Sequence, residues 1–217
     1  TTCVEIICGN RRFVLVMGTG IRSLGNALFK EMLDKGLDIV FLLSHVHWDH
    51  IQGLPFFGPL YVNKKVAQNK FQFLGGLDWM QSIEACLRGQ MDPPLFPVSF
   101  REIERIVGQI RFEGIHDLMS LEFDDGITDR RSGKIIISCG KLNHPNETYG
   151  WRIEYKGKTF VFTTDNEPFD PTVPDPRLKR LADQADVWVT DCQYDRDTYN
   201  GKCGVPRHGW GHSYPEA

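Results

Sequence analysis

Short apolar runs separated by glycine, proline and charged residues recur along the chain and predict alternating strands and helices. The run at 39–43 is apolar throughout, which is typical of a strand buried on both faces. The runs at 3–8 and 12–17 are joined by Gly9 and Asn10, two residue types that tolerate the backbone of a tight hairpin turn. The N-terminal part of the chain is therefore expected to begin with a hairpin beside a buried strand.

A second hairpin is predicted at 151–155 and 159–163, where polar and apolar residues alternate around a turn at Gly157. Apolar residues at helical spacing between Ile21 and Met32 predict a helix that ends at Gly36. Further strands are expected at 60–62, 103–113, 119–124, 135–138 and 187–190, and further helices at 78–89 and 178–185. This mixture predicts an α/β fold.

The segment 63–92 allows two interpretations. It contains an aromatic group, Phe71, Phe73 and Trp79, followed by the predicted helix with Asp78 as its N-cap. These aromatic residues fit either packing in the core or a lid or insertion over a binding site, because lids are often insertions of this kind. The segment is therefore a candidate lid as well as a candidate part of the core.

Composition narrows the class of protein. The chain has 217 residues, 41% of them hydrophobic and 24% charged, which is ordinary for a globular domain. The net charge of −3 argues against a surface that coats nucleic acid, and no apolar run is long enough to cross a bilayer. No secretory leader is visible, and the 6 cysteines form no Cys-x-x-Cys pair. We therefore expect a cytoplasmic protein with free thiols.

The chemistry is concentrated in the polar segment 44–53, which follows the buried strand. His45, His47, Asp49 and His50 lie within six positions here, in a chain with only 7 histidines. Histidine and aspartate are ligands that zinc and similar divalent metals prefer. On an extended turn, His45 and His47 point the same way, while Asp49 and His50 can turn toward a second ion. A metal site is therefore predicted, and a polar loop rich in histidine is the alternative.

This segment matches the HxHxDH motif of the metallo-β-lactamase superfamily, which the rest of the chain also resembles. The resemblance implies a single domain over 1–217 with a four-layer αβ/βα sandwich, in which two sheets carry helices on their outer faces and the metals lie at one edge. The family has additional chain at both ends, including one more ligand histidine beyond the last motif, so this chain looks truncated. An acidic residue that the family commonly carries near position 16 is replaced here by Val16.

The resemblance also implies the ligands of two divalent ions, with zinc favoured and manganese or iron as alternatives. In that assignment His45, His47 and His144 bind the first ion, Asp49 and His50 bind the second, and Asp165 bridges both. Taken alone, His144 could be a loop histidine and Asp165 a turn carboxylate. The histidine cluster favours the ligand role for both, because a metal site needs further ligands from elsewhere in the chain.

Gly211-His212-Ser213 resembles a signature of the phosphodiesterase branch of the superfamily, which contains tRNA 3′-end endonucleases and cyclic-nucleotide phosphodiesterases. There the histidine protonates the leaving oxygen or holds the phosphate, so the resemblance implies Asp49 and His212 as catalytic residues. A histidine in a flexible glycine-rich tail is the alternative for His212.

The implied function is hydrolysis of a small phosphodiester, such as a cyclic nucleotide, by hydroxide activated at a dinuclear metal centre. Only 21 positions separate His144 from Asp165, and a predicted hairpin fills them, so the RNA-gripping arm of bacterial tRNA endonucleases is not expected there. A small-molecule partner is therefore favoured over tRNA, no membrane partner is expected, and a homodimer is compatible with the sequence. A thioester or lactone hydrolase and a non-catalytic metal-binding domain are the alternatives.

Overall fold

The computed structural model describes residues 2–76, 82–130, 132–170 and 173–214. The chain divides into two compact units, Thr1–Ile115 and His116–Ala217, which we call the N-terminal and C-terminal units. The helices are α1 (Gly20–Ala27), α2 (Phe29–Lys35), α3 (Trp48–Ile51), α4 (Ile83–Gly89), α5 (Phe100–Ile106), α6 (Pro176–Ala182) and α7 (Arg196–Tyr199). The strands are β1 (Val4–Cys8), β2 (Arg11–Leu15), β3 (Asp38–Leu42), β4 (Lys70–Gly76), β5 (Gln109–Ile115), β6 (Ser120–Asp124), β7 (Lys134–Lys141), β8 (Tyr149–Tyr155), β9 (Lys158–Thr163) and β10 (Val187–Thr190).

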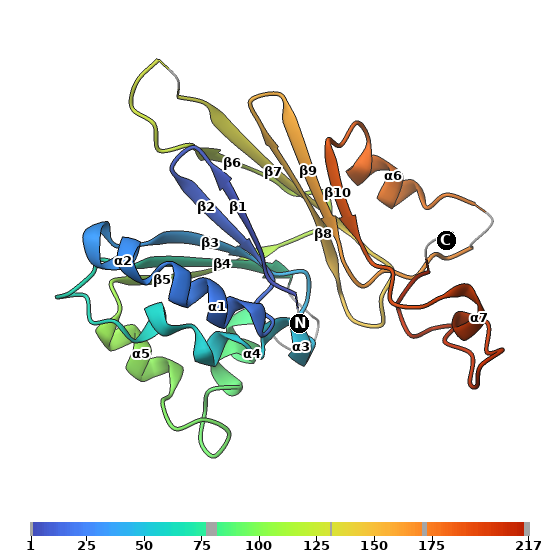
Figure 1. Ribbon diagram of the computed structural model, residues 1–217, viewed down its shortest axis with the longest axis horizontal. Coiled ribbons are helices and arrows are strands. Elements are labelled where there is room, and N and C mark those ends of the chain that lie inside the picture. The colour runs from blue at the N-terminus through green and yellow to red at the C-terminus, as the bar shows by residue number, and fades with distance from the viewer. Residues whose placement is uncertain (1, 77–81, 131, 171–172, 215–217) are drawn as a thin grey trace. The chain divides into compact units, whose positions relative to one another are not determined.

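The N-terminal unit is built on a five-stranded sheet in the order β1-β2-β3-β4-β5. Its first pair is antiparallel, and β2, β3, β4 and β5 run parallel. Helices α1, α2, α4 and α5 cover one face of this sheet (Figure 1). Between them lies an aromatic core, in which the rings of Phe41 and Phe73 stack with centroids 4.7 Å apart and Phe73 stacks on Phe112 at 5.2 Å. This core fixes the strand from which the histidine segment begins.

The C-terminal unit contains the second five-stranded sheet, in the order β10-β9-β8-β7-β6. Helix α6 packs on it through Leu181, which is buried against Leu142 and Val161 (Figure 1). β10 is parallel to β9, and both neighbours of β8 are antiparallel to it, so β7, β9 and β10 end at the same edge of the sheet. The residues that follow these strands are therefore gathered at one edge.

The predicted α/β class is confirmed, as are both hairpins and the buried strand, which the structure assigns to Asp38–Leu42. One predicted strand is wrong, and another begins too early. The first, 60–62, lies largely in a 3-10 helix, Gly58–Tyr61, where Pro59 presets the helical φ. The start of the second, 103–113, belongs to α5, because Ser99 and Glu102 form a reciprocal capping box that begins a helix.

The candidate lid segment contributes to the core. Its residues 70–76 form β4, paired with β3 and β5, and Phe71 and Phe73 are fully buried. The helix predicted at 78–89 is α4, which begins after an N-cap at Ser82. The proposed N-cap Asp78 and the aromatic residue Trp79 lie outside the described residues. Within the described ranges, none of the helices combines the length and apolar character that crossing a bilayer requires.

A buried carboxylate organises the turn between β6 and β7. Asp125 is fully buried and accepts hydrogen bonds from the backbone N–H of Ile127 and Gly133, at 3.0 and 2.8 Å, and from the Tyr155 hydroxyl at 2.8 Å. Burial by itself raises the pKa of this carboxyl, but the hydrogen bonds outweigh it and hold the pKa below its usual value. The ionised carboxylate therefore stabilises the folded unit.

We expect Asp125→Asn to lower the free energy of unfolding at neutral pH and the difference from wild type to shrink in acid. Because the folded-state pKa is depressed, the stabilisation is fully present above the unfolded-state pKa of about 3.9 and is lost as the pH falls through the folded-state value. Urea unfolding of chelator-treated protein at a series of pH values measures this. The neighbouring exposed Asp124, changed to Asn, is the control, and an acid-independent deficit in Asp125→Asn would contradict the prediction.

Candidate metal centre

The four predicted ligands of the N-terminal unit lie together after β3. Nε2 of His45 is 2.9 Å from Nδ1 of His47, and the ring of His50 lies 4.4 Å from that of His45, centroid to centroid. A carboxylate oxygen of Asp49 is 3.2 Å from Nε2 of His50. His45 and His50 are buried, whereas Asp49 is exposed. The structure thus forms two adjacent donor groups from one short segment.

The imidazole nitrogens fit a divalent ion. Nδ1 of His45 lies 3.0 Å from the Ser44 hydroxyl, and a proton donated there leaves the Nε2 lone pair for a metal. Nitrogens 2.9 Å apart on His45 and His47 are close enough to bind one ion at the usual zinc–nitrogen distance of about 2.0–2.1 Å. The chemistry of the donors and their spacing therefore agree with the predicted first metal.

Backbone hydrogen bonds hold this histidine segment against the end of β2. The N–H of Met17 donates to the carbonyl of His50 at 2.7 Å, and the N–H of Gly53 donates to the carbonyl of Met17 at 2.9 Å. Val16, just before, is buried and has a φ of 53°, a conformation that a β-branched residue rarely adopts. Backbone hydrogen bonds with Met17, the residue after Val16, thus hold the histidine segment in place.

In the C-terminal unit, His144 and Asp165 follow the ends of β7 and β9. Nδ1 of His144 lies 2.9 Å from the carbonyl oxygen of Gly211. A carbonyl can only accept, so this nitrogen carries the proton and Nε2 keeps its lone pair. Asp165 is buried, has a φ of 53°, and offers a carboxylate oxygen within 4.8 Å of a ring nitrogen of His144. The structure therefore brings these two predicted ligands together.

His212 pairs with a carboxylate that sequence reasoning missed. Nδ1 of His212 is 3.0 Å from Asp191 Oδ2, and both residues offer a donor atom within 4.8 Å of one from Asp165. An ionised carboxylate is an acceptor, so Nδ1 of His212 carries a proton and Nε2 faces away from Asp191. One feature of the sequence could have indicated Asp191: it comes just after a strand, β10, as Asp165 comes just after β9.

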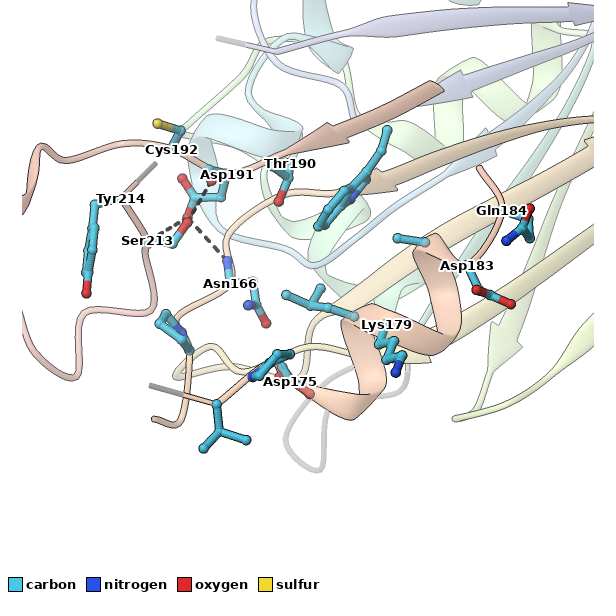
Figure 2. Close-up of a pocket in the computed structure, with 16 residues that line it drawn as sticks. Asn166, Asp175, Lys179, Asp183, Gln184, Thr190, Asp191, Cys192, Ser213 and Tyr214 are labelled. Atoms are coloured by element: carbon cyan, nitrogen blue, oxygen red, sulfur yellow. Dashed lines mark hydrogen bonds between the residues drawn. The ribbon is translucent and has the colours of Figure 1, made fainter. Parts of the chain in front are cut away.

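Asp191 also organises the chain around it, as Figure 2 shows. It accepts from the backbone N–H of Asn166 at 3.3 Å and of Ser213 at 3.2 Å, and the Ser213 hydroxyl donates to its carbonyl at 2.6 Å. A cavity of about 850 Å³ lies beside this group, with Asp191 and Ser213 in its wall and Trp188 and Leu178 among its apolar side chains. These contacts fix the position of Ser213, which directly follows His212.

A second residue that the sequence did not reveal is Glu167. It is buried and accepts a hydrogen bond of 2.6 Å from the Tyr199 hydroxyl. Burial, and then the hydrogen bond to Glu167, raises the pKa of Tyr199, so the phenol stays protonated and remains a donor. No sequence motif marks this pair, because its members lie 32 positions apart.

Each unit thus assembles the residues predicted for it: His45, His47, Asp49 and His50 in one, and His144, Asp165 and His212 in the other. A shared dinuclear centre that combines the two sets stays a prediction.

Comparison with known proteins gives the same classification. The family model described as a β-lactamase superfamily domain matches residues 18–217. Ribonuclease Z of Prochlorococcus marinus (strain MIT 9312) is 27% identical over 172 residues, which are 77% of this chain and 47% of that protein. The chain therefore spans about half the length of the curated relatives it matches.

Solved structures agree on the fold. The short form of human tRNase Z superposes with a TM-score of 0.60 and 17% identity, over 99% of this chain and 78% of that one. A diphosphatase from the PhnP family has a TM-score of 0.55 and 17% identity, over 88% of this chain and 60% of that one. With the family match across both units, these likenesses confirm the resemblance first seen in the histidine motif, and the chain belongs to the metallo-β-lactamase superfamily.

Proposed function

We propose that this chain is a metal-dependent hydrolase that cleaves a small phosphodiester, with two divalent ions held by the predicted ligands. The observation that carries the proposal is the Asp191–His212 pair, because it holds an imidazole with a proton on Nδ1 and places a donor atom of each residue within 4.8 Å of a carboxylate oxygen of the predicted ligand Asp165. Metal hydrolysis of an alkyl diester is accelerated by such an acid beside the metal, because it protonates the departing alkoxide.

The roles of the residues follow from their contacts. Bound divalent ions supply Lewis acidity and lower the pKa of a coordinated water. Asp191 stabilises the cationic form of His212 through Nδ1 and leaves Nε2–H to donate the proton to the leaving oxygen. Asp49 is the exposed carboxylate of its segment and serves as second-metal ligand and as the group that orients the attacking water. Zinc suits the nitrogen-rich set His45, His47 and His144, and manganese or iron are the alternatives.

A small substrate is favoured over a folded RNA. Between His144 and Asp165 the chain consists of β8, β9 and short connections, all within the described residues, so no extended arm is present there. The net charge of −3 is also unfavourable for a surface that follows an RNA backbone. The name of the curated relatives supports a second candidate, cleavage of an RNA phosphodiester. We further propose a cytoplasmic location, since the 6 cysteines are scattered along the sequence and form no Cys-x-x-Cys pair.

The test is a substrate panel on zinc- or manganese-loaded protein: bis(p-nitrophenyl) phosphate, a 2′,3′-cyclic nucleotide, a precursor tRNA, and S-lactoylglutathione as a thioester. Turnover of the small diesters that a chelator abolishes and metal restores is expected. Preferential cleavage of the RNA would support the second candidate instead. Turnover of the thioester alone, or metal binding without any turnover, would contradict the proposal and point to a thioester hydrolase or a non-catalytic domain.

The variant His212→Ala tests the acid within the same panel. Loss of a general acid costs typically about 10²–10⁴-fold, and the cost falls on poor leaving groups. We therefore expect a large drop in kcat for the cyclic nucleotide, whose leaving group is an alkoxide, and a small drop for bis(p-nitrophenyl) phosphate, whose phenolate leaves without protonation. Equal losses on both substrates would show that His212 acts in some other way.

A further inference from the structure

The carboxylate of Glu167 is the anchor of the loop that carries His212. It is 7% exposed, and besides the Tyr199 hydroxyl it accepts the backbone N–H of Gly209 and of Gly211, each at 2.8 Å. Hydrogen bonds to an ionised acceptor are the stronger kind, and a buried carboxylate needs several of them. Glu167 therefore holds a glycine-rich segment that has little regular structure of its own.

The same residue is tied to the segment that carries His144. The N–H of Glu167 donates to the carbonyl of Asn143 at 2.8 Å, and the Asn143 side-chain amide donates to the carbonyl of Glu167 at 2.8 Å. This reciprocal pair joins the chain after β7 to the chain after β9. Glu167 thus connects three segments of the C-terminal unit: those of His144, of Asp165 and of His212.

The connection reaches the imidazole of His144 through Gly211. The carbonyl of Gly211 accepts from His144 Nδ1 at 2.9 Å, and its N–H is bound by Glu167. The fit is close, because a Cβ at position 211 would lie 2.1 Å from that ring nitrogen, and the backbone has a φ of +81°. The place of Gly211 therefore decides where His144 points and which of its nitrogens carries the proton.

We propose that Glu167 is a positioning residue that orients His144 for metal binding by fixing Gly211 against its ring. The proposal deepens the proposed function and rests on it only for the choice of His144 as a ligand. Partners that orient a ligand histidine typically change metal affinity by about 10–100-fold when they are removed. Glu167 acts on His144 indirectly: it accepts the N–H of Gly211, and the carbonyl of Gly211 accepts the hydrogen bond from His144.

The test compares Glu167→Gln with Tyr199→Phe. Glutamine keeps the shape of the side chain but has only one acceptor oxygen for the two glycine N–H groups, whereas Tyr199→Phe removes a different donor to the same carboxylate. We expect Glu167→Gln to weaken zinc binding about 10–100-fold in competition with a chromophoric chelator, and Tyr199→Phe to change it little. The nitrogen chemical shifts of His144 in metal-free protein should show the Nδ1–H tautomer in wild type and a mixture in Glu167→Gln.

Two glycine variants make the test independent of folding. Gly209 and Gly211 have nearly equal φ values, +78° and +81°, but a Cβ at 209 meets no atom within 4 Å. Gly211→Ala should therefore reproduce the loss of zinc affinity, and Gly209→Ala should show only a lower unfolding temperature. Unchanged affinity and tautomer in Glu167→Gln would overturn the proposal. Wild-type protein that binds zinc but hydrolyses no diester would overturn the proposed function and leave this comparison valid.

Discussion

Replacing His144 by alanine is expected to remove one bound metal ion and nearly all phosphodiester hydrolysis. Loss of a direct ligand should cost more than the roughly 10–100-fold that loss of an outer partner costs. The reason is geometric: Nδ1 of His144 is committed to the carbonyl of Gly211, so its Nε2 is held in one direction as a ligand. Metal content by mass spectrometry and kcat/KM on a small diester measure the two effects.

The chain offers a matched control at His116. This histidine lies in the same unit, is exposed, and also has Nδ1 close to a backbone carbonyl, that of Asp117, at 3.0 Å. His116→Ala should keep the metal and the activity of wild type. If both variants retain metal equally, His144 is no ligand and the assignment that the family resemblance implies for it is wrong.

Alanine at position 53 is expected to destabilise the N-terminal unit by about 3 kcal/mol, the upper end of the usual cost of overpacking. A Cβ there would lie 2.1 Å from the carbonyl oxygen of Gly18 and 2.7 Å from Cγ2 of Ile21. The first of these is backbone just before α1, and the N–H of Gly53 is itself bound to Met17, so neither side can move freely. The histidine segment should be displaced with it.

Urea unfolding followed by circular dichroism measures the effect, with Gly58→Ala as the control. A Cβ at Gly58 meets no atom within 4 Å, so that variant should stay within about 0.5 kcal/mol of wild type. Gly53→Ala should also bind metal more weakly at temperatures where it remains folded. Equal stability of the two variants would show that the contact between Gly53 and Gly18 is not a constraint in solution.

The candidate ligands that the sequence indicated cluster within each unit, whereas several elements around them were predicted with the wrong type or bounds. His45 was singled out by the dense histidine motif, and Asp165 by the family resemblance that this motif carries; their role as metal ligands stays a prediction. The capping box of Ser99 and Glu102 is also visible in the sequence. It predicts a helix over the apolar residues near 103, where a strand was predicted instead. That error reflects a local signal that was overlooked.

Asp191 and Glu167 could not be found in the same way. A lone aspartate after a strand has many structural uses, and only the fold brings Asp191 to His212, 21 positions later. The partners of Glu167 include backbone N–H groups 42 and 44 positions away, and any residue type could supply such groups. Residues that act through the backbone of distant segments leave no pattern in a single sequence.

The common direction of β7, β9 and β10 has a practical consequence. Since these strands deliver His144, Asp165 and Asp191 at one edge of their sheet, the turn at Lys156-Gly157 lies at the opposite edge, a strand length or roughly 20 Å away. A Cβ added at Gly157 meets nothing within 4 Å. A fluorophore or surface tether attached there would leave the edge that carries the candidate ligands undisturbed.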